Sequence, residues 1–211
     1  MSAEAFEALV KIAGPVSRET FSRLQRFVAL FQRWNAVTNL VAASTVEDLW
    51  ARHILDSAQL AKLRPLSGRW VDLGSGGGFP GLVLAILGRE TPGFRIDLVE
   101  SNRKKAGFLQ TASGELGLPA AIHGRRIEQV HEKIGQVDVV TSRALAPLSH
   151  LLALSEPWLT KGATALFHKG REYRREIEES SHLWHYHLIE HPSAVESQSV
   201  ILEISRLDRA R

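Results

Sequence analysis

Apolar positions near the start of the chain recur at helical spacing. Between residues 17 and 35 they return every three or four positions, which is the pattern of one buried helical face. Ser17 stands just before this stripe and has the side chain of a helix N-cap. The pattern therefore predicts a helix over residues 17–35. Its apolar face consists of Phe21, Leu24, Phe27, Val28, Phe31 and Trp34.

A second helical pattern covers residues 44–63. Ser44 lies three residues before Glu47, which is the spacing of a capping box at a helix start. Pro65 and the Leu-Ser-Gly after it end the pattern. We expect residues 1–65 to form a helical extension of the domain that follows, with the whole chain as one compact unit. The apolar face of the second helix consists of Leu49, Trp50, Ile54, Leu55 and Leu60.

From Arg69 onward, short β-type runs alternate with helical stretches. This alternation predicts a parallel sheet with helices on both faces. The last two runs are joined by a link too short for a crossover helix, so they should pair antiparallel. We expect residues 66–211 to form a doubly wound, Rossmann-like α/β sheet of seven strands that ends in an antiparallel hairpin. The expected strands cover residues 69–73, 94–100, 120–124, 137–144, 163–170, 184–192 and 197–207, and the expected helices about 81–88, 101–116 and 148–158.

Composition narrows the class of protein. The 211 residues are 44% hydrophobic, enough for one substantial core. The sequence has no cysteine, which excludes thiolate catalysis and sulfur-ligated metal sites, and we expect no metal. No apolar run reaches about 18 residues, and acidic residues stand where a signal peptide has basic ones. These features predict a cytoplasmic protein that does not enter a membrane.

Basic residues gather in a few places along the chain. The formal net charge is only +3, so the distribution carries more information than the total. Any single cluster is compatible with a solvated face, but several clusters in one small protein make RNA or DNA a candidate partner. The clusters are Arg18 to Arg33, Arg103 to Lys105, Arg125 with Arg126, and Lys161 to Arg175.

The passage from the first strand into the following helix is rich in glycine. Five of the eight residues from Gly74 to Gly81 are glycine, which indicates close contact between backbone and ligand. Gly78 is followed by Phe79 and Pro80 instead of the Lys-Ser or Lys-Thr of a triphosphate-binding loop. The spacing G-x-G-x-x-G, which begins at Gly76, is a weak dinucleotide fingerprint. Two alternatives therefore remain at this point, a loop that binds a dinucleotide and a turn that binds no ligand.

Asp72 distinguishes between the remaining ligands. Its carboxylate stands two residues before Gly74 and would repel the pyrophosphate of a dinucleotide. S-adenosyl-L-methionine carries an ammonium and a sulfonium but no phosphate, so the same carboxylate would attract it. Glu100 ends the second strand, where an acid can hold ribose hydroxyls in either ligand class. We expect S-adenosylmethionine as the cofactor, with NAD as the alternative, and contacts at Asp72, Gly74, Gly76 and Glu100.

The loops after the third and fourth strands should complete the site. Ligands of doubly wound sheets lie across the carboxyl ends of the strands. Residues 124–128 are therefore expected at the adenine, with Ile127 packed on the ring and Glu128 within reach. Residues 141–144 are expected at the methyl group and its acceptor. Arg143 could reach the methionine carboxylate or the edge of the acceptor.

Motifs that are absent from the sequence exclude some chemical classes of methyl acceptor. The chain has Ser-Arg-Ala at residues 142–144, without the Asn-Pro-Pro-Tyr or Asp-Pro-Pro-Tyr typical of enzymes that methylate exocyclic amines. Methylation at carbon 5 of pyrimidines needs a cysteine, which is absent. A ring nitrogen that is already nucleophilic, such as guanine N7, needs alignment more than a general base. Arg143 and His53 are the candidate catalytic residues.

Several stretches resemble, in order and spacing, the glucose-inhibited division protein B family, also called ribosomal RNA small subunit methyltransferase G. They are Trp34-Asn35, Asn39-Leu40, residues 52–57, Asp72 to Gly81, residues 142–144 and Lys169-Gly170. The resemblance implies a class I methyltransferase fold and transfer of a methyl group from S-adenosylmethionine to N7 of one guanine in 16S rRNA, in the bacterial cytoplasm. By position it implies cofactor contacts at Gly74, Phe79, Ile127, Glu128 and Arg143.

Two segments are candidates for contact with RNA. Arg52 and Asp56 have the spacing of an i,i+4 pair, and their helix, with His53, is expected to border the active site. The second segment offers phosphate contacts at Lys169 and Arg171, with Arg174 and Arg175. The expected partner is 16S rRNA or the small ribosomal subunit, and the chain is expected to act as a monomer. An oxidoreductase, a noncatalytic RNA-binding module and a small-molecule methyltransferase remain alternatives.

Overall fold

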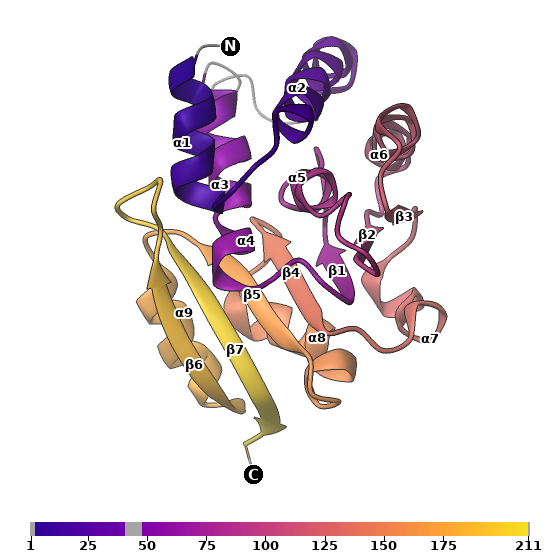
Figure 1. Cartoon of the computed structure of the whole chain (residues 1–211). Helices are drawn as coiled ribbons and strands as arrows, with labels where there is room; N and C mark the ends of the chain where they lie inside the picture. Colours follow the sequence, from indigo (N-terminus) through magenta and orange to yellow (C-terminus); the bar gives the residue numbers. More distant parts are fainter. Residues whose placement is uncertain (1–2, 41–47, 211) are drawn as a thin grey trace.

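A single seven-stranded sheet organises the molecule (Figure 1), whose computed structural model describes residues 3–40 and 48–210. The strand order is β3-β2-β1-β4-β5-β7-β6. Strands β1 to β5 are parallel to one another, and β7 runs antiparallel to both β5 and β6. The strands are β1 (Arg69–Leu73), β2 (Arg95–Val99), β3 (Ala120–His123), β4 (Val139–Arg143), β5 (Thr164–Lys169), β6 (Trp184–Pro192) and β7 (Val200–Arg209).

Helices cover both faces of the sheet, and each face has its own hydrophobic cluster. The earlier helices share one cluster with Trp70, Ile96 and Leu166 of the sheet. The later helices pack on Val71, Val140 and Phe167, which point to the other face. The first group is α1 (Ala3–Ala13), α2 (Arg18–Thr38), the π-helix η2 (Trp50–Leu55), α3 (Asp56–Ala58), α4 (Leu60–Leu63), α5 (Gly81–Leu87) and α6 (Arg103–Leu116). The second group is η3 (Ile127–Gln129), α7 (His131–Ile134), α8 (Leu148–Leu159) and α9 (Tyr173–Ser181).

The doubly wound sheet and its C-terminal hairpin confirm the fold expected from the sequence. β1 has the bounds that the pattern predicts, and the last two strands pair antiparallel. Helix α9 was not expected, because charged residues dominate its sequence. Its buried side consists of Tyr173, Ile177 and Ser180, spaced by four and three positions. This spacing is the helical signal that the pattern of charges hid.

The helix predicted over residues 17–35 is present as α2. The Ser17 side chain accepts a hydrogen bond from the Thr20 backbone N–H, as an N-cap does. The capping box predicted at Ser44 and Glu47 lies outside the described residues. From Trp50 the second helix differs from expectation, since it begins as the π-helix η2. The division of the chain after residue 65 stays a prediction, and the helices before it share a cluster with the sheet.

None of the described helices is both long enough and apolar enough to cross a membrane.

Candidate functional site

The glycine loop between β1 and α5 has a backbone that other residues would strain. Gly74, Gly76 and Gly78 have φ values of 72°, 54° and 91°. These lie in the left-handed region, which glycine enters without steric cost. The Gly74 and Ser75 amides donate to the Val99 carbonyl at 2.9 and 3.1 Å, so the loop is fixed to the end of β2. The strand end and the loop therefore form one rigid rim.

Asp72 lies beneath this loop rather than on its ligand-facing side. The side chain has no exposed surface, Oδ2 accepts from the Gly81 amide at 3.1 Å, and Oδ1 accepts from the Thr141 hydroxyl at 3.1 Å. Burial raises the pKa of Asp72 to about 6, with the nearby charge of Glu100 acting in the same direction. This placement differs from the expected contact with the cofactor. Asp72 holds the end of the loop by accepting the bond from the Gly81 amide, and its neighbours leave the carboxylate no open side.

Glu100 is the acid that reaches the ligand-facing side. Its Oε2 accepts from the Gly76 amide at 2.9 Å, and its Oε1 accepts from the Asn102 amide at 2.7 Å. A carboxylate has about four lone-pair positions, so both oxygens can accept further hydrogen bonds. Glu100 thus holds the loop in shape and still offers acceptors to a ribose.

A cavity of about 730 Å³ opens between the glycine loop and the ends of β2 and β4. Its size and its mixture of apolar walls with a few polar groups suit a nucleoside-sized ligand. It brings together most of the residues that the sequence predicts for the cofactor, and His53 as well. Those lining it are Gly74, Gly76, Phe79, Glu100, Ile127, Glu128 and Arg143. Asp72 does not line this cavity.

His53 joins Phe79 and Arg143 at the wall of this cavity. Its ring lies 4.8 Å from the ring of Phe79, centroid to centroid, and Arg143 Nη1 donates to Nδ1 over 2.7 Å. Because a guanidinium has no acceptor, Nδ1 must carry a lone pair and the proton must sit on Nε2. Burial, with the charge of Arg143, lowers the pKa of His53 to about 4. The imidazole is therefore neutral near pH 7, and its one lone pair is already used.

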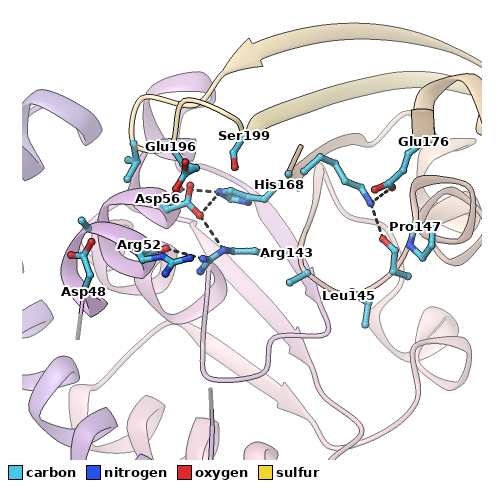
Figure 2. A pocket seen from close by; sticks show the side chains of 16 residues that line it. Asp48, Arg52, Asp56, Arg143, Leu145, Pro147, His168, Glu176, Glu196 and Ser199 are labelled. Carbon is cyan, nitrogen blue, oxygen red and sulfur yellow. Dashed lines mark hydrogen bonds and ion pairs between the residues drawn. The ribbon is translucent and has the colours of Figure 1, made fainter. Parts of the chain in front are cut away.

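Arg143 is held by the helix that the sequence places at the border of the site. Nε lies 3.0 Å from Oδ2 of Asp56, and Nη2 donates to the Arg52 carbonyl over 2.7 Å. Together with the bond to His53, all three guanidinium nitrogens have partners in this one helix. The expected pair between Arg52 and Asp56 is therefore wrong. Asp56 pairs with Arg143 at the end of β4 instead (Figure 2).

A second cavity, of about 770 Å³, lies on the other side of Arg143. Residues 143–146 line both cavities and form the wall between them. Within this wall Ala144 has φ +53°, which is unusual for a residue with a side chain. Leu145 leans on the glycine loop, where a Cβ added to Gly74 would lie 2.6 Å from its Cδ1. Figure 2 shows the second cavity, which is lined mainly by charged and polar groups, among them Asp48, Arg52, Asp56, His168, Lys169, Glu176, Glu196 and Ser199.

Most of the cations in the segment from Lys169 to Arg175, which the sequence offers for RNA, are paired with acids. Lys169 lines the second cavity but is buried, and its ammonium donates to the Ala146 carbonyl and to Glu176. Its charge is thus used to hold the dividing wall, which differs from the expected phosphate contact. Arg174 and Arg175 face Glu190 and Glu179 at 4.0 and 2.8 Å. Arg171 is exposed and lines neither cavity.

A different basic group surrounds the mouth of the first cavity. Lys105, Arg125 and Arg126 line it. The loop of Arg125 packs on the start of α6, since a Cβ added to Gly124 would lie 3.5 Å from that of Ala106. No described residue forms an ion pair with these three cations or with Arg103 and Lys104. We call these five residues the basic rim. The sequence showed both clusters but could not show that they meet.

Some lining residues had no signal in the sequence. Nε2 of His168, at the end of β5, donates a hydrogen bond to the Asp56 carbonyl over 2.9 Å, and His168 lines the second cavity. Glu196 and Ser199 reach that cavity from the loop between β6 and β7. These residues are far in the sequence from Asp56, which lines the same cavity, and they share that cavity with it only in the folded chain. Among the described residues, no group of three His, Cys, Asp or Glu is arranged to hold a metal ion.

Several solved structures share this fold. A structure titled as a mutant of MtNAS in complex with S-adenosylmethionine matches 97% of this chain and 80% of its own, with a TM-score of 0.57 and 14% identity. The ribosomal protein L11 methylase from Lactobacillus delbrueckii subsp. bulgaricus matches 76% of this chain and 79% of its own, with a TM-score of 0.54 and 16% identity. At such identities the likeness shows the fold alone.

Sequence relatives are much closer. A protein named ribosomal RNA small subunit methyltransferase G from Chelativorans sp. (strain BNC1) is 56% identical over 209 residues, which is 99% of this chain and 100% of the relative. The protein of that name from Brucella canis is 55% identical over 210 residues, or 99% of both chains. The GidB family model, described as rRNA small subunit methyltransferase G, matches residues 20–204. The chain therefore belongs to the GidB family of rRNA small subunit methyltransferases.

Proposed function

We propose that this chain transfers a methyl group from S-adenosylmethionine to N7 of a specific guanine in 16S rRNA of the small ribosomal subunit. The observation that carries the proposal is the pair of cavities that share residues 143–146 as a wall. Both open at the carboxyl ends of the strands, where ligands of doubly wound sheets bind. A cofactor on one side and a base on the other would meet at this wall.

The first cavity fits S-adenosylmethionine. Glu100 would accept hydrogen bonds from the ribose hydroxyls, while Ile127 and Glu128 would contact the adenine. Gly74 and Gly76 leave room for the ligand against the backbone, and Phe79 adds an apolar surface. The methionine part would then extend toward Arg143. When bound, the cofactor supplies a methyl group on a positively charged sulfur.

Guanine N7 suits the groups that line the two cavities. The N7 lone pair forms the new C–N bond, the S–CH₃ bond breaks, and its electron pair stays on sulfur. No proton moves, so no general base is required. This agrees with a neutral His53 whose lone pair is occupied and with an Asp56 that is paired with Arg143. Alignment of N7 with the methyl group would supply most of the rate enhancement.

The basic rim is the part of the surface best suited to the RNA backbone. Three of its five cations line the first cavity, and none of the five pairs with a described acid, whereas the cations of α9 have Glu partners. Arg171 would contact RNA on the far side of the second cavity. The site is complete within one chain, so we propose that the protein acts as a monomer. It would work in the cytoplasm, where its RNA substrate is found.

Methyl transfer with labelled cofactor tests this proposal. The protein is incubated with S-adenosylmethionine that carries a tritiated methyl group, together with naked 16S rRNA or intact small subunits. We expect label in 7-methylguanosine at one position, and digestion followed by chromatography identifies the nucleoside. Cleavage at the methylated base with borohydride and aniline then maps the position. Label in another nucleoside, or none in either substrate from a protein that binds the cofactor, would contradict the proposal.

A further inference from the structure

The loop that joins β6 to β7 is fixed onto helices from the first third of the chain. We call this loop, residues 193–199, the hairpin tip. The Ala194 amide donates to Oε1 of Gln59 over 3.0 Å, and Nε2 of Gln59 lies 3.3 Å from the Ser193 hydroxyl. Val195 packs against the hydrophobic cluster of the early helices. The hairpin tip therefore has a defined position relative to the site.

Gln59 also connects the hairpin tip to the ion pair at the centre of the site. Its Nε2 donates to Oδ1 of Asp56 over 2.7 Å, while Oδ2 of Asp56 receives Arg143. Gln59 is only 5% exposed, so its hydrogen bonds are shielded from water. These bonds thus fix the position of the hairpin tip relative to Arg143, which lies in the wall between the cavities.

The hairpin tip supplies one side of the second cavity. Val195, Glu196 and Ser199 line it, and Figure 2 shows Glu196 and Ser199 on the other side of Asp56 and Arg143 from Leu145. A base whose N7 points at the dividing wall would turn its opposite edge toward the hairpin tip. The lining of this tip therefore meets the part of the base that does not react.

Four carboxylates line this cavity, and they differ in whether other residues already bind them. Asp56 is occupied by Arg143 and Gln59, and Glu176 by Lys169 and the Leu148 amide. Glu196 is exposed, and no described residue bonds to its carboxylate. Its backbone is nevertheless held, because its amide donates to the Ser193 hydroxyl over 3.2 Å. Asp48, the fourth, adjoins residues 41–47, which the structure does not describe.

We propose that Glu196 recognises the target guanine by accepting hydrogen bonds from its N1–H and N2 amino group. This inference rests on the proposed function. The edge of guanine that carries these groups offers two parallel donors, which match the two oxygens of one carboxylate. Methylation at N7 makes the base positively charged. The hydrogen bonds to Glu196 therefore strengthen as the reaction proceeds, which favours the transition state over the ground state.

The test combines a protein variant with a base analogue. Inosine lacks the 2-amino group but keeps N7, and it replaces guanosine at the methylated position mapped above. Wild type and Glu196→Gln are compared on both RNAs, with Glu178→Gln as the control. Glu178 is also exposed, its carboxylate bonds to no described residue, and it lines neither cavity.

We expect Glu196→Gln to lower kcat/KM on guanosine RNA by about ten- to a hundredfold, the range for a hydrogen bond to a charged group. Inosine should lower kcat/KM of the wild type and of the control by a clearly larger factor than that of Glu196→Gln. Cofactor affinity should be the same in all three proteins. Equal inosine penalties in wild type and Glu196→Gln, or wild-type rates in Glu196→Gln, would overturn the assignment.

A binding measurement separates this proposal from the proposed function. The affinity of each protein for both RNAs is measured by fluorescence anisotropy with S-adenosylhomocysteine present, so that no transfer is needed. Wild type and Glu178→Gln should prefer guanosine RNA over inosine RNA, and Glu196→Gln should lose that preference. A wild type that binds with this preference but transfers no methyl group contradicts the proposed function alone. A wild type without the preference contradicts the assignment of Glu196.

Discussion

Arg143 and Asp56 meet on the line between the two cavities, with Nε of the arginine 3.0 Å from Oδ2 of the aspartate. Their side chains are 20% and 11% exposed. Each is bound by further groups, Arg143 by His53 and the Arg52 carbonyl and Asp56 by Gln59. Together these bonds join the end of β4 to the π-helix η2, to Asp56 at the start of α3 and, through Gln59, to the hairpin tip.

Substituting Asp56→Asn should destabilise the protein and slow methyl transfer. The change leaves the largely buried guanidinium without its counter-charge, which costs about 2 kcal/mol of unfolding free energy at this exposure. Urea unfolding measures the loss. Glu156→Gln is the matched control, because it removes an ion pair with Arg209, whose side chain is 71% exposed, and should cost less than about 1 kcal/mol. Equal losses in the two variants would show that the Asp56 pair is no more important than a surface pair.

His53 should contribute a loss of stability as the pH is lowered from 6.5 to 4. Folding lowers the pKa of His53 to about 4 from 6.5, so only the unfolded chain takes up this proton within that window. The unfolded state then binds more protons, and stability decreases with decreasing pH. His53→Gln should remove this contribution from the pH dependence of the unfolding free energy. His185→Gln, at an exposed histidine, should retain the wild-type dependence.

Asp72 should contribute a pH dependence of opposite sign. Its folded pKa of about 6 lies above its ordinary value of 3.8, so the folded state takes up a proton first as the pH falls through 6. The contribution to stability is fully present below pH 3.8 and is lost as the pH rises through 6. Relative to Asp72→Asn, the wild type should therefore gain stability between pH 6 and pH 4. Asp208→Asn, at an exposed aspartate, serves as the control. If wild type and Asp72→Asn show the same slope, Asp72 is solvated and faces the ligand, as the sequence suggested.

Alanine at Gly76 should weaken cofactor binding much more than alanine at Gly93. Both glycines have positive φ, 54° and 78°, so alanine strains the backbone by a similar 1–2 kcal/mol or so at each. Gly76 lines the cofactor cavity and donates its amide to Glu100, whereas Gly93 has no atom within 4 Å of an added Cβ. Calorimetric titration with S-adenosylmethionine should show at least about tenfold weaker binding for Gly76→Ala alone, the equivalent of one lost contact of about 1.4 kcal/mol. Similar affinities in both variants would place the ligand elsewhere.

Neutralising the basic rim should make RNA binding less sensitive to salt. Each phosphate contact contributes about 0.7 to the slope of log affinity against log salt for a single strand. The triple variant Lys105→Ala, Arg125→Ala, Arg126→Ala should therefore lower the slope by about 2, with folding retained. The double variant Arg174→Ala, Arg175→Ala is the control on the rival surface, where both cations have Glu partners. A reduced slope in the double variant alone would move the RNA path to α9.

The sequence predicted the sheet well because its strands and helices differ in hydrophobic period. The carboxyl ends of parallel strands lie at one edge, so Glu100, Ile127 and Arg143 could be assigned to one site from their positions alone. Helix α9 was not predicted because few of its residues are buried and most of the others are charged. The hydrophobic pattern of a sequence indicates a helix by the spacing of its buried residues. A buried face with so few residues gives a weak signal.

The sequence could not predict which charged side chains pair with each other. The bond between Arg143 and His53 joins residues 90 positions apart, whereas local spacing suggested a partner for Asp56 four positions away. Asp72 was assigned to the ligand because its charge suits a cationic cofactor, but the motif does not show whether a carboxylate near the end of β1 faces outward or inward. The close approach of Gly81, where a Cβ would lie 2.5 Å from Oδ2 of Asp72, decides for the inward orientation.

The hydrogen bond between Gln59 and Ala194 spans 135 positions and has a consequence for synthesis of the chain. Every residue that lines the cofactor cavity has been made once Leu154 has been added. The second cavity receives its remaining side only from residues 195–199, and β7 must then pair with β5 to hold that side in place. A nascent chain would therefore acquire the groups proposed to hold the methyl donor well before those proposed to hold the base. The proposed acceptor site would be complete only after residue 199 has been added and β7 has formed.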